Sequence, residues 1–73
     1  MMDKEQILAL MEESEQHLIE YTDVNGVVRT GFVDVYESSY DNGGGEASIC
    51  FAGEDGEMLI VEESDIADIK ILD

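Results

Sequence analysis

Two tyrosines and an asparagine beside a polar loop are the residues best suited to bind a ligand. Tyr36 precedes this loop, and Tyr40 lies within it, followed by Asp41 and Asn42. An aromatic ring stacks on a nucleobase or packs on an apolar group, and amides and carboxylates supply hydrogen bonds. The glycines that follow, Gly43–Gly45, favour a mobile loop, where binding residues are often found. These residue types indicate recognition rather than catalysis.

The chain offers little for catalysis or for a metal ion. His17 is the only histidine and Cys50 the only cysteine, so they lack the further ligands of a zinc site, and no internal disulfide can form. We interpret His17 as a favourable group at a helix C-terminus. Carboxylates gather at two turns, beside Gly43–Gly45 and around Gly56, but without EF-hand spacing, and we interpret them as solvated turn residues. We expect no metal and no cofactor, and we predict that the protein is not an enzyme.

The strongest global signal is the charge. Nineteen Asp and Glu residues against three Lys and Arg give a formal net charge of −16. Proteins bind phosphate backbones and anionic lipids by replacing counterions with Lys and Arg, so this surface disfavours both. It favours a basic protein partner instead.

Size and composition predict one folded domain over residues 1–73. Apolar residues make up 44% of the chain and occur in short runs, which favours a folded state over disorder. A small domain without disulfides is typical of a reducing compartment, so we expect a cytoplasmic protein. The apolar run over residues 7–11 is too short and too acidic in its surroundings for a signal peptide, and no run approaches the roughly twenty residues of a membrane span.

The N-terminal segment predicts an amphipathic helix over residues 3–17. Asp3 and Gln6 have the spacing of a capping box, and Met2 and Ile7 that of a hydrophobic staple. The residues of the expected buried stripe follow at spacings of three and four: Ile7, Leu10, Met11, Ser14 and Leu18. We interpret this helix as a lid packed on a sheet, and the alternative is a helix that docks a partner.

A hairpin follows the helix. Asn25 and Gly26 lie between Val24 and Val27, a strong hairpin signal that predicts antiparallel pairing of residues 19–24 with 27–36. Gly31 interrupts the second of these strands and predicts a bulge or a sharp bend, which would let one long strand serve both sides of a small barrel.

Three more strands complete the predicted fold. They are expected at residues 47–51, 58–61 and 66–72, separated by a turn at 53–56 and a short break at 62–65. Ala47, Ile49 and Phe51 should share one face. Five short antiparallel strands close most economically into a small barrel over residues 18–72, which would remove exposed edges.

The segment from Gly31 to Asn42 resembles the first motif of the Sm and Sm-like (LSm) proteins. That motif runs through a glycine, an aliphatic residue, an aromatic-acidic pair and a nucleotide-contacting aromatic residue, matched by Gly31, Val33, Tyr36-Glu37 and Tyr40. A helix before five strands and a short break before the last strand are also similar to that family. The resemblance implies a mainly β fold with one N-terminal helix, a five-stranded antiparallel SH3-like or Sm-like small barrel.

The uridine pocket of that family is only half matched. In the family, a stacking residue and its asparagine form one side of the pocket, and an arginine-glycine pair forms the other. The resemblance places Tyr40 at the stacking position, but Asp41 stands where asparagine is expected, with Asn42 one residue late. Glu62 and Glu63 occupy the arginine-glycine place. Carboxylates there should abolish this mode of RNA binding, so the chain resembles a divergent member of the family.

Three functions remain open. We favour a protein-interaction or adaptor module, in which a strand edge or the Tyr40 loop docks a basic partner. The alternatives are an Sm-like RNA-binding protein and an acidic nucleic-acid mimic that inhibits a basic nucleic-acid-binding protein. Family members form rings of six or seven subunits, but self-repulsion favours a monomer or small oligomer here. The candidate binding residues are Tyr36, Tyr40, Asp41, Asn42, Glu62 and Glu63.

Overall fold

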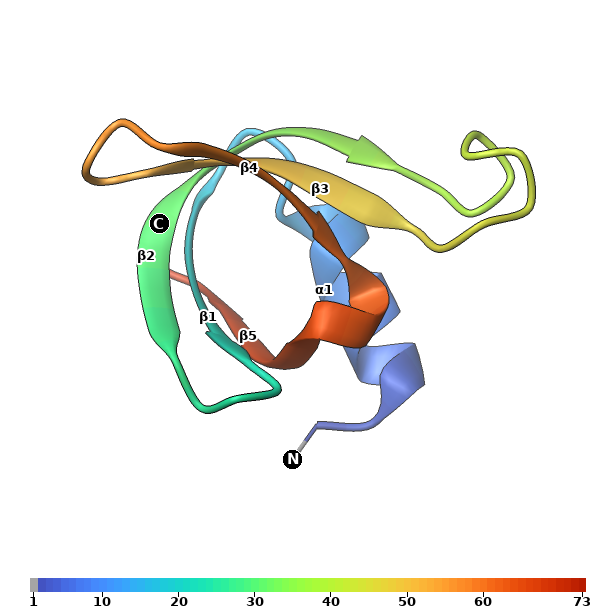
Figure 1. The fold of residues 1–73 in the computed structure, drawn as a ribbon, viewed down its shortest axis with the longest axis horizontal. Helices are drawn as coiled ribbons and strands as arrows, with labels where there is room; N and C mark the ends of the chain where they lie inside the picture. The colour runs from blue at the N-terminus through green and yellow to red at the C-terminus, as the bar shows by residue number, and fades with distance from the viewer. Residues whose placement is uncertain (1) are drawn as a thin grey trace.

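The computed structural model describes residues 2–73 and arranges them as one helix and one five-stranded sheet (Figure 1). The elements are α1 (Lys4–Glu13), β1 (Leu18–Asp23), β2 (Val28–Glu37), β3 (Ser48–Gly53), β4 (Met58–Glu62), the 3₁₀ turn η1 (Glu63–Asp65) and β5 (Ile66–Ile71). All strand pairs are antiparallel, in the order β4-β3-β2-β1-β5. The predicted mainly β fold with an N-terminal helix is confirmed.

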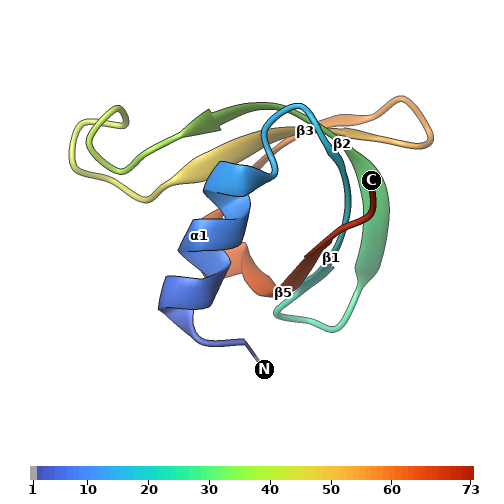
Figure 2. The same ribbon diagram turned by 180° about the vertical axis from the view of Figure 1, so that it is seen from behind.

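The sheet curls into a small barrel that is not closed. The first half of β2 pairs with β1 and the second half with β3, so the long strand turns the sheet through a strong bend (Figures 1 and 2). The strands at the two ends of the sheet, β4 and β5, are not hydrogen-bonded to each other. The prediction that closure removes exposed edges is therefore wrong, because both end strands keep one free edge.

Gly31 lies where β2 passes from one partner strand to the other. A Cβ atom at this position would collide with the carbonyl oxygen of Ala52 and with the ring of Phe51. The register shift that marks a bulge falls three residues later, at Asp34. Glycine is therefore required at position 31 by close approach of β3, and the bulge lies elsewhere.

The helix starts as predicted and packs on the sheet. Asp3 Oδ1 accepts a hydrogen bond from the Gln6 N–H at 2.9 Å, and Gln6 Oε1 accepts from the Asp3 N–H at 3.3 Å, which confirms the capping box. Ile7, Met11 and Ser14 are buried, and α1 contacts β5, β2 and η1. The Ser14 hydroxyl donates to the Met11 carbonyl at 2.6 Å, so this buried polar group is satisfied.

The helix ends earlier than predicted, at Glu13. Gln16 has a φ of +66°, a left-handed conformation that a continuing helix cannot contain. Leu18 consequently belongs to β1 and is 45% exposed, not part of the buried stripe. His17 lies beyond the helix, with Nδ1 2.9 Å from Asp73 Oδ1, so its interpretation as a group at the helix C-terminus is wrong.

The core fills the inside of the barrel. Phe51 is its largest fully buried side chain, and its ring meets that of Tyr21 edge to face at a centroid distance of 5.0 Å. Ala47, Ile49 and Phe51 are all buried, as expected of residues that share the inner face, and Ser48 between the first two is buried as well. The remaining buried apolar residues are Ile7, Met11, Ile19, Val33, Val61, Ile66 and Ile69.

The tip of the β1–β2 hairpin is organised by Asp23. Its N–H donates to the Val27 carbonyl at 2.8 Å, and its Oδ1 accepts from the N–H groups of Asn25 and Val27, both at 2.9 Å. Arg29 Nη1 donates to the other carboxylate oxygen at 2.8 Å. The turn therefore spans three residues, with Gly26 at a φ of +86°, and not the Asn-Gly pair alone.

These contacts predict an acid-sensitive hairpin tip. Hydrogen bonds from the Val27 N–H and from the Arg29 side chain lower the pKa of Asp23 below 3.8. The pKa of Asp23 is lower in the folded protein than in the unfolded chain. Its contribution to stability is therefore fully present above its ordinary pKa and is lost as the pH falls through the lowered pKa of the folded state. We expect the amide proton shifts of Asn25 and Val27 to change only as the pH falls through the lowered pKa of Asp23, as followed by NMR down to about pH 2. Titration of Asp23 at or above its ordinary pKa would contradict these hydrogen bonds.

Candidate recognition surface

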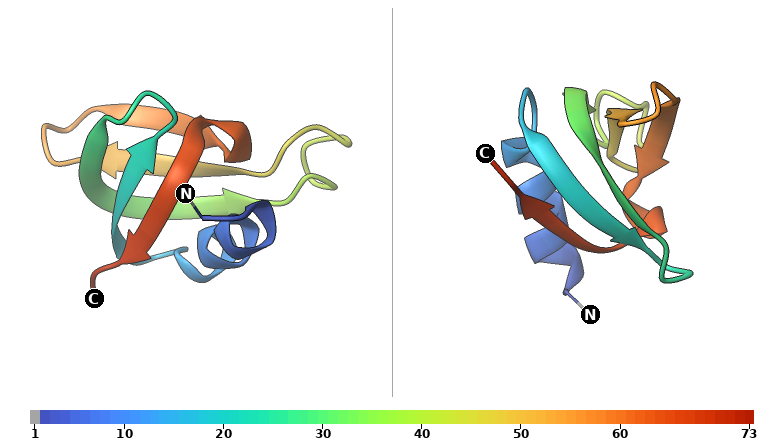
Figure 3. Two further views of the ribbon diagram at one scale, coloured as in Figure 1. Left: turned by 90° about the horizontal axis from the view of Figure 1, so that it is seen from below. Right: turned by 90° about the vertical axis from the view of Figure 1, so that its left-hand side faces the viewer.

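The loop between β2 and β3 is a hydrogen-bonded turn that projects away from the rest of the barrel (Figures 1 and 3). The Ser38 carbonyl accepts from the Asn42 N–H at 3.1 Å, and the Ser38 hydroxyl accepts from the Asp41 N–H at 3.1 Å. Gly43 and Gly44 have φ values of +69° and +87°, a conformation that glycine adopts without strain. The glycine run therefore serves the turn geometry.

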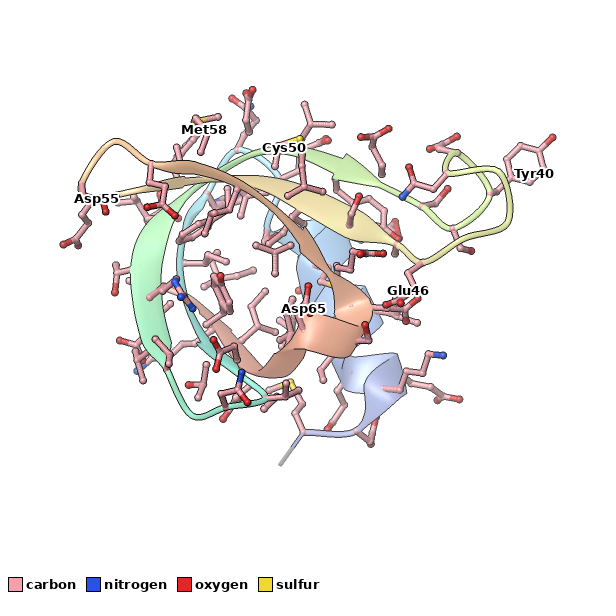
Figure 4. All side chains as sticks on the ribbon, viewed as in Figure 1. Tyr40, Glu46, Cys50, Asp55, Met58 and Asp65 are labelled. Carbon is pink, nitrogen blue, oxygen red and sulfur yellow. The ribbon has the colours of Figure 1, made fainter. Side chains whose placement is uncertain are left out.

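The two tyrosines do not form one aromatic surface. Tyr40 is 88% exposed at the loop tip and points away from the barrel (Figure 4). Tyr36 packs against the core, and this partial burial raises its pKa. The backbone N–H of Tyr36 donates to Glu15 Oε2 at 2.9 Å. Of the pair, Tyr40 alone offers an open ring face.

Asn42 and Glu62 meet at a shallow hollow. Asn42 Nδ2 donates to the Glu46 carbonyl at 2.7 Å and to the Ser48 hydroxyl at 3.1 Å. Both residues line a hollow of about 300 Å³ together with Glu37, Gly45, Glu46, Ser48 and Ile60. Because the Asn42 amide donors are engaged within the protein, Oδ1 is the group left for a ligand. Asp41 is exposed on the loop and does not line this hollow.

The side chains of Glu62 and Glu63 point in different directions. The Glu63 side chain is only 10% exposed, and its Oε1 accepts from the Ala47 N–H at 3.2 Å. Its Oε2 is buried and has no hydrogen-bond donor within residues 2–73. The nearby cation is Lys4, with Nζ at 3.8 Å from Oε2. The two adjacent glutamates, predicted as one site, therefore line different cavities.

An apolar patch on the outer face of β2, β3 and β4 was missed by sequence reasoning. Strand pairing aligns Val35 with Cys50 and Cys50 with Ile60, and the adjacent row aligns Phe32, Ala52 and Met58. Figure 4 shows Met58 and Cys50 on the same outer side of the sheet. Met58 and Ile60 are 62% and 67% exposed. We call these six residues the outer-face patch.

The available signal for this patch was the composition of β4. Leu59 and Val61 point inward, Leu59 half-buried and Val61 buried, and the residues between and before them, Met58 and Ile60, are apolar as well. A strand at the edge of a water-exposed sheet usually alternates apolar and polar residues. The unbroken apolar run therefore indicated a strand with apolar side chains on both faces, one face in the core and the other available to a partner.

An acidic row borders the outer-face patch. Glu37 of β2 and Glu62 of β4 align with Ser48 of β3, next to the row of Val35, Cys50 and Ile60. Glu57 directly precedes Met58 at the other end of β4. An apolar centre with a charged rim is the usual anatomy of a protein-binding surface.

The remaining reactive side chains do not assemble into a centre. His17 contacts Asp73, whereas Cys50 lies half-buried in the outer-face patch. Among residues 2–73, no group of three His, Cys, Asp or Glu side chains is arranged to hold a metal ion. Over the same residues, no helical segment has the length and apolarity needed to cross a membrane.

No protein-family model matches the chain, and no curated protein matches it. The function has to be argued from the surface of this chain itself.

Proposed function

We propose that this protein is an interaction module whose outer-face patch docks a basic, amphipathic segment of a protein partner. The observation that carries the proposal is the exposure of Met58 and Ile60, 62% and 67%, on an end strand of the sheet. Exposed apolar side chains next to an unpaired strand edge attract further chains, and monomeric proteins usually cover or charge such edges. Here a partner would cover the free edge of β4 and the exposed side chains beside it.

The edge of β4 supports binding of an extended segment. An added strand gains main-chain hydrogen bonds from the free side of β4, and its alternate side chains then lie beside Met58 and Ile60. A lysine on the same face of the added strand, opposite Glu62, would meet the acidic row of Glu37 and Glu62. The net charge of −16 adds long-range attraction for such a segment.

The test is a titration with a synthetic extended peptide that carries two valines and then a lysine at alternate positions, so that these side chains share one face, followed by NMR of the labelled protein. We expect shifts concentrated in β3 and β4, and none with a peptide in which glutamate replaces lysine. Ile60→Ser should weaken binding at least about tenfold, because burial of such a side chain is worth about 1.5–3 kcal/mol. The matched control is Val27→Ser, which removes a valine 45% exposed at the hairpin tip and should bind normally. Shifts confined to the Tyr40 loop would contradict the outer-face assignment.

A second copy of the chain is a poorer partner for the outer-face patch, because both copies carry a net charge of −16 and repel each other. We expect light scattering at low salt to give the monomer mass of 8.1 kDa. Added salt screens the repulsion, so the average mass should rise, and Ile60→Ser should suppress that rise. A six- or seven-subunit ring at low salt would contradict this expectation and favour assembly like that of the Sm-like proteins.

We also propose that the chain is a divergent Sm-like barrel, on the basis of the motif at Gly31, Val33, Tyr36 and Tyr40 and of the helix before five strands. RNA binding is the less supported function. Tyr40 is open to stacking, but Glu62 lies in the hollow beside Asn42, where it would repel phosphate.

A further inference from the structure

A cavity with apolar walls and a buried carboxylate lies at the side of the barrel. It has a volume of about 490 Å³ and is bounded by the start of α1, the tip of the β1–β2 hairpin and η1. Met2, Ile7, Val24 and Ile66 provide the apolar walls, and Glu46 and Glu63 provide carboxylates. Ligand sites in proteins commonly combine a mainly apolar lining with a few polar groups that fix orientation.

Glu63 is the group that points to a ligand. Its side chain is nine-tenths buried, and its Oε2 has no hydrogen-bond donor among the described residues. Burial of a carboxylate oxygen without a donor is unfavourable, so such groups in native proteins call for an explanation. Lys4 does not supply the missing bond, because its Nζ is 3.8 Å away and its side chain is 76% exposed.

Glu46 adds a second negative charge to the same cavity. Its Oε1 accepts from the Ser64 N–H at 2.8 Å. Hydrogen bonds from the Ser64 side chain and backbone lower the pKa of Glu46, so this carboxylate is ionised at neutral pH. Figure 4 shows Glu46 beside η1, the turn that also carries Glu63. A cation in the cavity would therefore meet two carboxylates from different parts of the chain.

We propose that this cavity binds a lysine side chain of a protein partner. The aliphatic stem would lie on Ile7 and Ile66, and the ammonium group would donate to Glu63 Oε2 and reach Glu46. A primary ammonium has three rotatable donors on a flexible stem, which suits a buried carboxylate that lines an apolar cavity. Lys4 would move aside, at little cost because it is exposed. The proposal does not depend on the outer-face patch, whose residues do not include any wall of this cavity.

The experiment is an NMR titration of the full chain with N-acetyl-lysine methylamide at constant ionic strength. N-acetyl-norleucine methylamide has the apolar stem without the ammonium, and tetramethylammonium has the charge without a donor. We expect saturable shifts at Ile7, Ser64 and Ile66 with the lysine probe only. Equal shifts with the norleucine probe, or with tetramethylammonium, would overturn the proposal, as would an absence of shifts with all three. Tighter binding of the arginine analogue would overturn the assignment to lysine.

Two variants and their controls make the test specific. Glu63→Gln keeps an oxygen that can accept from the Ala47 N–H, so this variant should fold. Its binding of the lysine probe should be about tenfold weaker. Glu13→Gln, which removes the same charge at an exposed helix position, should leave binding unchanged. Lys4→Gln removes the competing cation and should strengthen binding, whereas Lys70→Gln on β5 should have no such effect. Equal binding of the lysine probe by Glu63→Gln and Glu13→Gln would show that general charge attraction, not this cavity, binds the probe. That result would overturn the proposal whatever the outcome at the outer-face patch.

Discussion

Replacement of Phe51 with alanine is expected to leave most of the protein unfolded at room temperature. Phe51 is fully buried, and its ring contacts Tyr21 edge to face at 5.0 Å. Removal of a buried phenylalanine costs about 3–5 kcal/mol, partly from lost transfer free energy and partly from the cavity left behind. A domain of this size rarely has more than about 3–5 kcal/mol of stability. Circular dichroism without denaturant, compared with the wild-type protein in water and in urea, would measure the unfolded fraction.

The matched control is Phe32→Ala. Phe32 is the other phenylalanine of the chain, half-buried on the outer face of β2 opposite Ala52. The same atoms are removed, but fewer of them leave the interior, so the loss of unfolding free energy should be clearly smaller. Equal losses in the two variants would contradict a core centred on Phe51.

Gly31→Ala is expected to have an effect of similar size for a different reason. The added methyl group would collide with the Ala52 carbonyl oxygen and the Phe51 ring. Overpacking usually costs about 1–3 kcal/mol, and we expect the upper end because the first obstacle is backbone. β2 and β3 would have to separate at the bend. A fall in melting temperature measured by calorimetry, with loss of amide protection across β3, is the expected result.

Gly45→Ala is the control for that substitution. A Cβ at Gly45 would meet only the Asn42 carbonyl oxygen, at 3.3 Å, and its φ is not in the left-handed region. We expect little change in the melting temperature. If the two alanine variants melted together, the close approach of β3 to Gly31 would not exist in solution.

Features set by neighbouring residues were predictable from the sequence. The capping box of Asp3 and Gln6, the hairpin at Asn25-Gly26 and the burial of alternate β3 residues follow from local hydrogen bonds and from the two-residue period of a strand. The helix end was not predictable with the same accuracy. Glu15 and Gln16 are compatible with helix, but their side chains accept from Tyr36 and donate to Asp34 of β2, contacts from another strand that compete with further helical turns.

The candidate sites depended on long-range geometry. Adjacent Glu62 and Glu63 look equivalent in the sequence, yet a strand followed by a 3₁₀ turn directs one to the outer hollow and buries the other. Tyr36 and Tyr40 also look alike, but one packs on the core and the other is exposed at a loop tip. Side-chain direction at these positions is set by turns whose geometry residue type alone does not specify.

By itself, the sequence determined the charge, the five strands with their inward-facing residues, and the glycine at which the long strand bends. These features arise from composition and short-range periodicity. Only the tertiary structure decided that the barrel stays open, that Met58 and Ile60 face water, and that a buried Glu63 lines a cavity with apolar walls. The physical reason is that each of these features depends on which distant segments meet. The exposure of a side chain and its hydrogen bonds depend on its neighbours in space, and those neighbours come together only when the sheet curls.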